Sequence, residues 1–222
     1  MKNYILSLEK SSLFDGLSRE DIEKLYICLS AHKKTITKDS FVFRASDDVR
    51  FVYLILSGSM HIVDEDFWGN RSIIETMAAY TLFGEAYAFA STTKHLVNVI
   101  AAEDSTILEI DPMRLFGTCA DRCACHERLI KNTAHILSEK IVRLTEKLGH
   151  VAQRTMREKI LSYLSKCARQ TGGTSFSIPY SRQQLADYLY VDRSALSHEL
   201  SRLSKLGLIR YHKNDFELFA KH

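Results

Sequence analysis

Short polar and basic side chains recur at helical spacing between residues 192 and 206. The set comprises Arg193, Ser194, Ser197, His198, Ser201, Arg202 and Lys205. None of these positions carries a carboxylate, so this face can approach a polyanion. Its hydrogen-bond donors can also contact the acceptors on the edges of DNA bases. The pattern predicts a helix in the major groove of double-stranded DNA. An exposed polar face without a function would show the same pattern in an isolated helix.

The flanking segments predict how this face is held. Ser181 and Gln184 have the spacing of a capping box that begins a first helix, and Asp192 is a good N-cap for the second. Small Ala186 allows the two helices to cross closely. Three leucines face inward on the second helix: Leu196, Leu200 and Leu203. A hairpin around Lys213 follows, so the segment predicts a winged helix-turn-helix.

Three thiols and an imidazole lie within eight residues, Cys119, Cys123, Cys125 and His126. These groups can bind a thiophilic metal. Cysteine is often a small buried hydrophobe, and metal sites more commonly have Cys-x-x-Cys pairs, so an inert cluster is the favoured interpretation. The open alternatives are thiol-redox sensing, a metal, and haem ligated by His95 or His126.

The net charge of +3 conceals two halves of opposite sign. Residues 1–149 contain 18 Lys/Arg and 21 Asp/Glu, giving −3, whereas residues 150–222 contain 12 and 6, giving +6. A basic C-terminal segment suits a polyanion such as DNA. A merely solvated basic surface would give the same balance.

Composition predicts a cytoplasmic protein. The five cysteines are an odd number without obvious disulfide spacing, which favours a reducing compartment. No apolar run approaches the roughly 20 residues of a membrane span, and residues 1–12 lack the apolar region of a signal peptide.

Short β-rich runs separated by turns occupy the sequence from Lys34 to about Asp111. They cover residues 51–56, 61–63, 72–77, 97–101 and 106–110. They predict an antiparallel barrel or roll. Before them, Ser18 caps a predicted short helix whose inner face is Ile22, Leu25 and Leu29.

A regular apolar stripe follows the barrel. Its members are Ile130, Ala134, Leu137, Ile141, Leu144, Leu148 and Val151. Steps of four and three over three heptads are typical of a coiled coil, so we predict that this helix forms a dimer. The alternative is a helix packed only on its own barrel, which usually has a wider stripe. Gly149 and residues 150–155 interrupt the heptads before a further helix.

Taken together, these segments resemble the family of the cyclic-AMP receptor protein and the fumarate-nitrate reduction regulator, which are bacterial dimeric transcription factors. The matching segments are residues 13–18, 56–59, 83–85, the heptad helix, 182–186 and 192–197. The resemblance spans nearly all 222 residues. It implies an α+β fold with a cyclic-nucleotide-binding-like β-roll at 1–115, a dimerisation helix at 116–150, and a winged helix-turn-helix at 151–222.

The resemblance also implies roles for individual residues. By position, Arg193, Ser194, Ser197 and His198 read bases, and Arg182, Arg202 and Lys213 complete the expected DNA-binding set. His198 stands where better-known members have arginine. An imidazole generally offers one hydrogen bond where arginine offers guanine two, so the operator sequence is open. The implied partners are double-stranded DNA, a second copy of the chain, RNA polymerase and an unidentified small-molecule effector.

The effector pocket of the family corresponds to Tyr80, Phe83, Gly84, Glu85, His95 and Lys140. Members that bind cyclic nucleotides have Gly-Glu followed ten residues later by Arg-Ser, whose arginine neutralises the phosphate. Here His95 and Leu96 occupy the second pair, so that charge is missing.

Two further positions depart from the nucleotide-binding pattern. Lys140 and Ile141 replace the hydroxyls of the dimer helix, and Tyr80 replaces a usual glycine. We therefore expect cyclic AMP not to bind. An iron–sulfur cluster of the family's N-terminal type is not expected either, because no cysteine precedes Cys28.

An enzyme is the first alternative to a transcription regulator. The sequence contains no Gly-x-Ser-x-Gly, His-Glu-x-x-His or Gly-x-x-x-x-Gly-Lys motif, so we expect no enzymatic activity. A DNA-packing protein without an effector is a second alternative, but retention of a full barrel argues against it.

Overall fold

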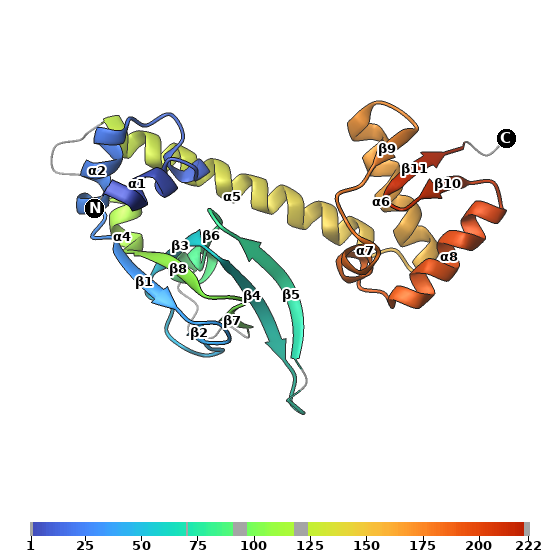
Figure 1. The fold of residues 1–222 in the computed structure, drawn as a ribbon, viewed down its shortest axis with the longest axis horizontal. Helices are drawn as coiled ribbons and strands as arrows, with labels where there is room; N and C mark the ends of the chain where they lie inside the picture. Colours follow the sequence, from blue (N-terminus) through green and yellow to red (C-terminus); the bar gives the residue numbers. More distant parts are fainter. Residues whose placement is uncertain (1, 70, 91–96, 118–123, 220–222) are drawn as a thin grey trace. The chain divides into compact units, whose positions relative to one another are not determined.

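The computed structural model describes residues 2–69, 71–90, 97–117 and 124–219 (Figure 1). The chain forms two compact units, residues 1–137 and 138–222, here called the N-terminal and C-terminal units. Their boundary falls within the long helix α5 (Ala124–Val151). The division into segments 1–115, 116–150 and 151–222 stays a prediction. No helix in the described ranges has the length and apolar character needed to cross a membrane.

Short helices begin the N-terminal unit: α1 (Lys2–Leu8), η1 (Ser12–Phe14) and α2 (Arg19–Cys28). The Ser18 hydroxyl caps α2 by accepting a hydrogen bond from the Asp21 N–H at 3.2 Å. The predicted inner face, Ile22, Leu25 and Leu29, is buried. Both the cap and the apolar face of this helix are therefore confirmed.

Two four-stranded antiparallel sheets form the roll (Figure 1). One has the order β1 (His32–Ile36), β8 (Ser105–Ile110), β3 (Val52–Ser57), β6 (Leu82–Phe83). The other has the order β2 (Phe41–Phe43), β7 (Val97–Ala101), β4 (Ser59–Glu65), β5 (Arg71–Ala78). This confirms the α+β roll. Strand β1 was not recognised individually because only Ile36 in it is buried, so it has no apolar alternation.

Strand β3 separates two hydrophobic clusters. Because successive side chains of a strand point to opposite faces, Val52 and Leu54 pack with the N-terminal helices, whereas Tyr53 and Ile55 fill the inside of the roll. Complete burial of an aliphatic side chain contributes about 1.5–3 kcal/mol. The strand therefore joins the helical layer and the roll into one unit.

Helices α3 (Glu85–Phe89) and α4 (Pro112–Phe116) precede α5 (Ala124–Val151). Early in α5, Leu129 and Ile136 are buried against the N-terminal helices. The Asn132 amide donates to the carbonyl oxygen of Leu13 at 3.0 Å. The helix continues past Gly149 to Val151 and the next helix begins at Met156, so the break lies within the predicted stretch but after the glycine; one glycine costs a helix only about 1 kcal/mol relative to alanine.

The C-terminal unit contains helices and one small antiparallel sheet. Its helices after α5 are α6 (Met156–Thr171), α7 (Arg182–Leu189) and α8 (Arg193–Lys205). The sheet has the order β10 (Ile209–His212), β11 (Asp215–Leu218), β9 (Ser175–Ser177). The hairpin β10–β11 is the expected wing, whereas the three-residue strand β9 was not predicted.

One core joins the three helices to the sheet. Ala186 of α7 is completely buried, as its small size indicated. The leucines of α8 that were predicted to face inward, Leu196, Leu200 and Leu203, are also completely buried. Phe176 of β9 and Phe216 of β11 stack beneath them with ring centroids 6.4 Å apart. The core therefore fixes which side of α8 faces outward.

Candidate nucleic-acid interface

Local hydrogen bonds fix the turn between α7 and α8. The capping box at Ser181 and Gln184 is complete, with its two bonds at 3.3 and 2.8 Å. Tyr190 ends α7 in a left-handed conformation, φ 53°. Asp192 then caps α8 by accepting from the Ala195 N–H at 2.8 Å. A hydrogen bond from the Ser194 hydroxyl, together with backbone N–H groups, lowers the pKa of the Asp192 carboxyl.

The outward face of α8 carries the predicted donors. Arg193, Ser194, His198 and Arg202 are exposed. The Ser197 hydroxyl donates to the Arg193 carbonyl oxygen at 3.0 Å, which leaves its lone pairs available as acceptors. Within the described part of the chain, the side chains of Arg193 and His198 make no hydrogen bond or ion pair. These two side chains are therefore available to an external partner.

The wing lies beside the C-terminal part of α8. The hydroxyls of Ser201 and Tyr211 lie 3.3 Å apart, which links α8 to β10. Lys213 is exposed at the tip of the hairpin, where its φ of 53° places it in the left-handed region. The ammonium group of Lys213 can therefore reach a phosphate next to the groove that α8 would occupy.

Arg182 has a more internal environment than the other predicted contacts. Its guanidinium donates from Nη2 to the Lys213 carbonyl oxygen at 3.1 Å. The same group lies over the rings of Tyr211 and Phe216, at 5.3 and 5.9 Å from their centroids. Arg182 thus supports the wing, and a DNA contact by this side chain stays a prediction.

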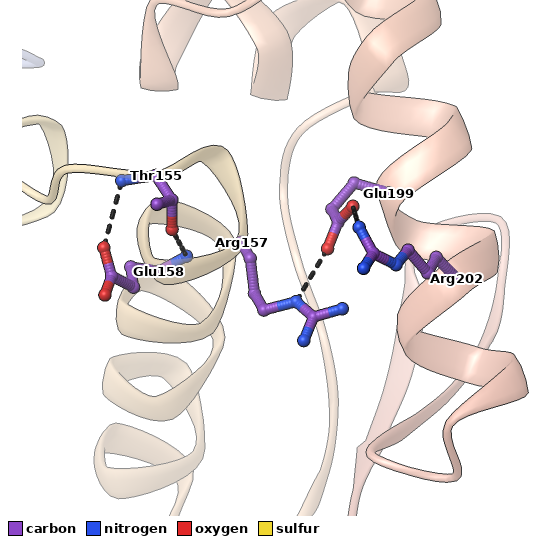
Figure 2. A network of polar contacts seen from close by, with 5 residues as sticks. All are labelled: Thr155, Arg157, Glu158, Glu199 and Arg202. Carbon is purple, nitrogen blue, oxygen red and sulfur yellow. Dashed lines mark hydrogen bonds and ion pairs between the residues drawn. The ribbon is translucent and has the colours of Figure 1, made fainter.

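A network of charged residues behind α8 was missed in the sequence (Figure 2). Arg157 of α6 reaches across to Glu199 of α8, with Nε and Oε1 2.8 Å apart. The other carboxylate oxygen of Glu199 lies 3.5 Å from Nη1 of Arg202. The Glu199 side chain is only 12% exposed. A carboxylate next to three buried leucines was the one available signal of an inward-facing charge.

His150 near the end of α5 is buried in the C-terminal unit. Its Nδ1 lies 2.9 Å from the Ser162 hydroxyl of α6, and its ring packs against the rings of Tyr163 and Tyr188. Burial lowers the pKa of His150, and the positive charge of Lys166 lowers it further. The neutral imidazole therefore belongs to the packing of α5, α6 and α7.

Three of the expected effector-pocket residues, Phe83, Gly84 and Glu85, lie at the start of α3. Gly84 has φ 80°, and a Cβ there would lie 2.8 Å from the Tyr53 ring, so this position requires glycine. The rings of Phe83 and Tyr53 stack with centroids 5.0 Å apart. Burial, followed by the charge of Glu109, raises the pKa of Tyr53 to about 12. Aromatic side chains thus fill this part of the roll.

The remaining candidates for the effector pocket lie in different parts of the chain. Glu85 is buried at the first position of α3. Tyr80 has φ 70°, the left-handed conformation that a glycine adopts at lower cost. Lys140 belongs to the C-terminal unit, and His95 lies outside the described residues. Phe83, Gly84 and Glu85 are consecutive at the start of α3, and the pocket role of all six candidates stays a prediction.

The cysteine cluster is described only in part, because Cys119 and Cys123 lie outside the described residues. Cys125 is buried in the hydrophobic core of the N-terminal unit, as an inert thiol would be. His126 is also buried, and its Nδ1 lies 3.9 Å from Sγ of Cys28, a contact that sequence analysis missed. Among the described residues, no three His, Cys, Asp or Glu side chains gather as a metal would require.

Family models match both units. Residues 33–122 match the cyclic nucleotide-binding domain, and residues 158–219 match the Crp-like helix-turn-helix domain. The regulatory protein HlyX of Actinobacillus pleuropneumoniae is 23% identical over 184 residues, covering 80% of this chain and 73% of HlyX. The nitrogen fixation regulation protein FixK of Azorhizobium caulinodans is 24% identical over 178 residues, covering 78% of this chain and 68% of FixK.

The fold is also that of solved structures. The c-di-GMP responsive global regulator CLP of Xanthomonas campestris has a TM-score of 0.58 and 20% identity, and the match covers 92% of this chain and all of that one. CprK complexed with OCPA has a TM-score of 0.63 and 15% identity, covering 88% and 89%.

Proposed function

Because the chain belongs to the Crp/Fnr family of DNA-binding transcription regulators, we propose that it reads DNA through α8 as a two-fold symmetric dimer. The observation that carries this proposal is the outward face of α8. There, Arg193 and His198 are exposed and make no internal polar contact within the described residues. As predicted, the family consists of transcription regulators and not of enzymes.

The proposed contacts of α8 and the wing with DNA are of two kinds. Arg193, Ser197 and His198 are placed to contact base edges, which specify sequence. Lys213 on the wing would contact phosphates, which supply affinity without sequence preference, and Arg202 near the end of α8 would do so when it is not paired with Glu199. Caps and the buried leucines hold α8, so Arg193, Ser197, His198 and Arg202 share one rigid helix.

The proposed dimer interface is the apolar stripe on α5. In the single chain, Ile141, Leu144 and Leu148 are 64%, 59% and 65% exposed. Large apolar side chains at this spacing are typical of a helix that packs against a second copy. A two-fold dimer would present two copies of α8 to half-sites about one helical turn, roughly 34 Å, apart. Ile130, Ala134 and Leu137 would continue the stripe.

We further propose that the N-terminal unit responds to an effector other than a cyclic nucleotide. The support is the replacement of the cassette arginine by His95 and the aromatic packing of Tyr53 and Phe83 next to Gly84. Thiol, metal or haem sensing through Cys119, Cys123, Cys125 and His126 is the alternative. The protein would act in the cytoplasm, where DNA and RNA polymerase are its partners.

Two substitutions test the roles assigned to α8 and the wing. Arg193→Ala should cost about 1–3 kcal/mol on a cognate duplex and relax base preference, because it removes a base-edge donor. Lys213→Ala should weaken cognate and random duplexes alike and flatten the salt dependence, because it removes a phosphate contact. Fluorescence anisotropy with both duplexes measures these effects. If the two substitutions changed cognate and random binding equally, α8 would not be the reading helix.

A further inference from the structure

Both oxygens of the Glu199 carboxylate are engaged on the inner side of α8. Oε1 accepts from Nε of Arg157 at 2.8 Å, and Oε2 forms an ion pair with Nη1 of Arg202 at 3.5 Å (Figure 2). The two arginines differ in exposure, with side chains 34% exposed for Arg157 and 62% for Arg202. Glu199 therefore ties α8 to α6 and also holds one exposed cation of α8.

A carboxylate at this position has an electrostatic cost for DNA binding. Without it, Arg157 and Arg202 together would carry +2 close to the proposed interface; with it, the three side chains carry +1. A glutamate therefore reduces the attraction for every DNA sequence alike, because phosphates are present in all of them. An uncharged side chain of similar size would avoid this cost, but it would leave the partly buried Arg157 guanidinium without a charged partner.

We propose that Glu199 is a specificity-determining residue that restrains Arg202 from non-cognate phosphates while holding α8 on α6 through Arg157. This inference rests on the proposed function, since it requires α8 to be the helix that faces DNA. On random DNA, phosphate contacts supply nearly all the affinity, so a released Arg202 would strengthen binding there. On cognate DNA, a loosened α8 would no longer hold Arg193 and His198 in position against the base edges. Release of Arg202 strengthens binding to any sequence, whereas the loosened helix weakens cognate binding alone, so the ratio of cognate to random affinity falls.

Counterion release gives the expected gain in affinity for random DNA when Arg202 is released. Each neutralised phosphate contributes about 0.9 to the slope of log affinity against log salt, so one extra contact is worth roughly eight-fold between 1 M and 0.1 M salt. Glu199→Gln keeps the shape of the side chain and removes its charge. It should tighten binding to random duplex about five- to ten-fold at 0.1 M salt and steepen the slope by about 0.9.

Companion variants separate release of Arg202 from loss of the tether between the helices. Glu199→Gln combined with Arg202→Gln should return random-duplex affinity and salt slope to wild-type values or below. Arg157→Gln removes the tether but leaves Glu199 with Arg202, so it should not tighten binding to random DNA. Because Glu199→Gln leaves Arg157 without a charged partner, the Arg157→Gln/Glu199→Gln pair provides a second variant in which Arg202 is released.

The measurement is anisotropy titration of the full chain with random and cognate duplexes between 0.05 and 0.3 M salt, with thermal unfolding as a check on folding. Stronger and more salt-sensitive binding to random DNA by Glu199→Gln and by Arg157→Gln/Glu199→Gln, but not by Glu199→Gln/Arg202→Gln, would support the proposal. Unchanged random binding, or equal effects of Arg157→Gln and Glu199→Gln, would overturn it and leave the role of α8 intact. Failure of the wild-type chain to bind duplex DNA would instead overturn the proposed function.

Discussion

Replacing Leu144 by glutamate should separate the two copies of the proposed dimer. Complete burial of a leucine contributes about 1.5–3 kcal/mol. Leu144 is 59% exposed in the single chain, so burying this exposed part in the dimer contributes about 1–2 kcal/mol per copy. The substitution in both copies makes the free energy of dimerisation about 2–4 kcal/mol less favourable, which raises the dissociation constant of the dimer roughly 30- to 700-fold. Two glutamates facing each other across the symmetry axis would add charge repulsion to this lower bound.

Sedimentation velocity over a range of concentrations measures the dissociation constant, and gel shift on a palindromic duplex measures the loss of DNA binding. Val142→Glu is the matched control, because Val142 is 55% exposed and lies two residues away, off the stripe. It should leave the dimer intact. A Leu144→Glu protein that stayed dimeric, or a Val142→Glu protein that dissociated equally, would refute the assignment of the interface.

Two further predictions concern the buried histidine and the effector pocket. Because burial lowers the pKa of His150 in the folded chain, the unfolded chain takes up its proton first as the pH falls. The contribution of His150 to stability should therefore be complete above about pH 6.5 and be lost as the pH falls through the lowered pKa. Urea unfolding at pH 7.5 and 5.5 gives the free energy of unfolding at each pH. The difference between the two values should be smaller for His150→Gln than for the wild-type chain. An equal difference would contradict the packing role. Cyclic AMP should give no heat in titration calorimetry and no change in DNA affinity, because the cassette lacks its arginine; micromolar binding would contradict that inference.

Signals confined to a few neighbouring residues predicted the local structure well. The Ser181 capping box, the Asp192 N-cap and the inward leucines of α8 each follow from contacts within one or two helical turns. Such contacts are encoded in spacing, so the helix-turn-helix could be placed accurately. Strand β9 could not, because three residues with one buried side chain leave no usable period.

Contacts between distant parts of the chain were not visible in the sequence. Arg157 and Glu199 are 42 residues apart, and Cys28 and His126 are 98 apart. No helical or strand period relates such pairs, so only the packed fold brings them together. For the same reason the sequence did not show that the Arg182 guanidinium lies on the wing and contacts Tyr211, and a DNA contact by Arg182 stays a prediction.

The most direct test of the central claim is selection of duplexes from a random-sequence pool by the full chain, followed by sequencing of the bound fraction. We expect an inverted repeat whose half-site centres lie about one helical turn, roughly 34 Å, apart. The Arg193→Ala chain should enrich the same motif with relaxed preference in both half-sites. A bound pool without a symmetric motif would show that the chain does not read DNA as a two-fold dimer.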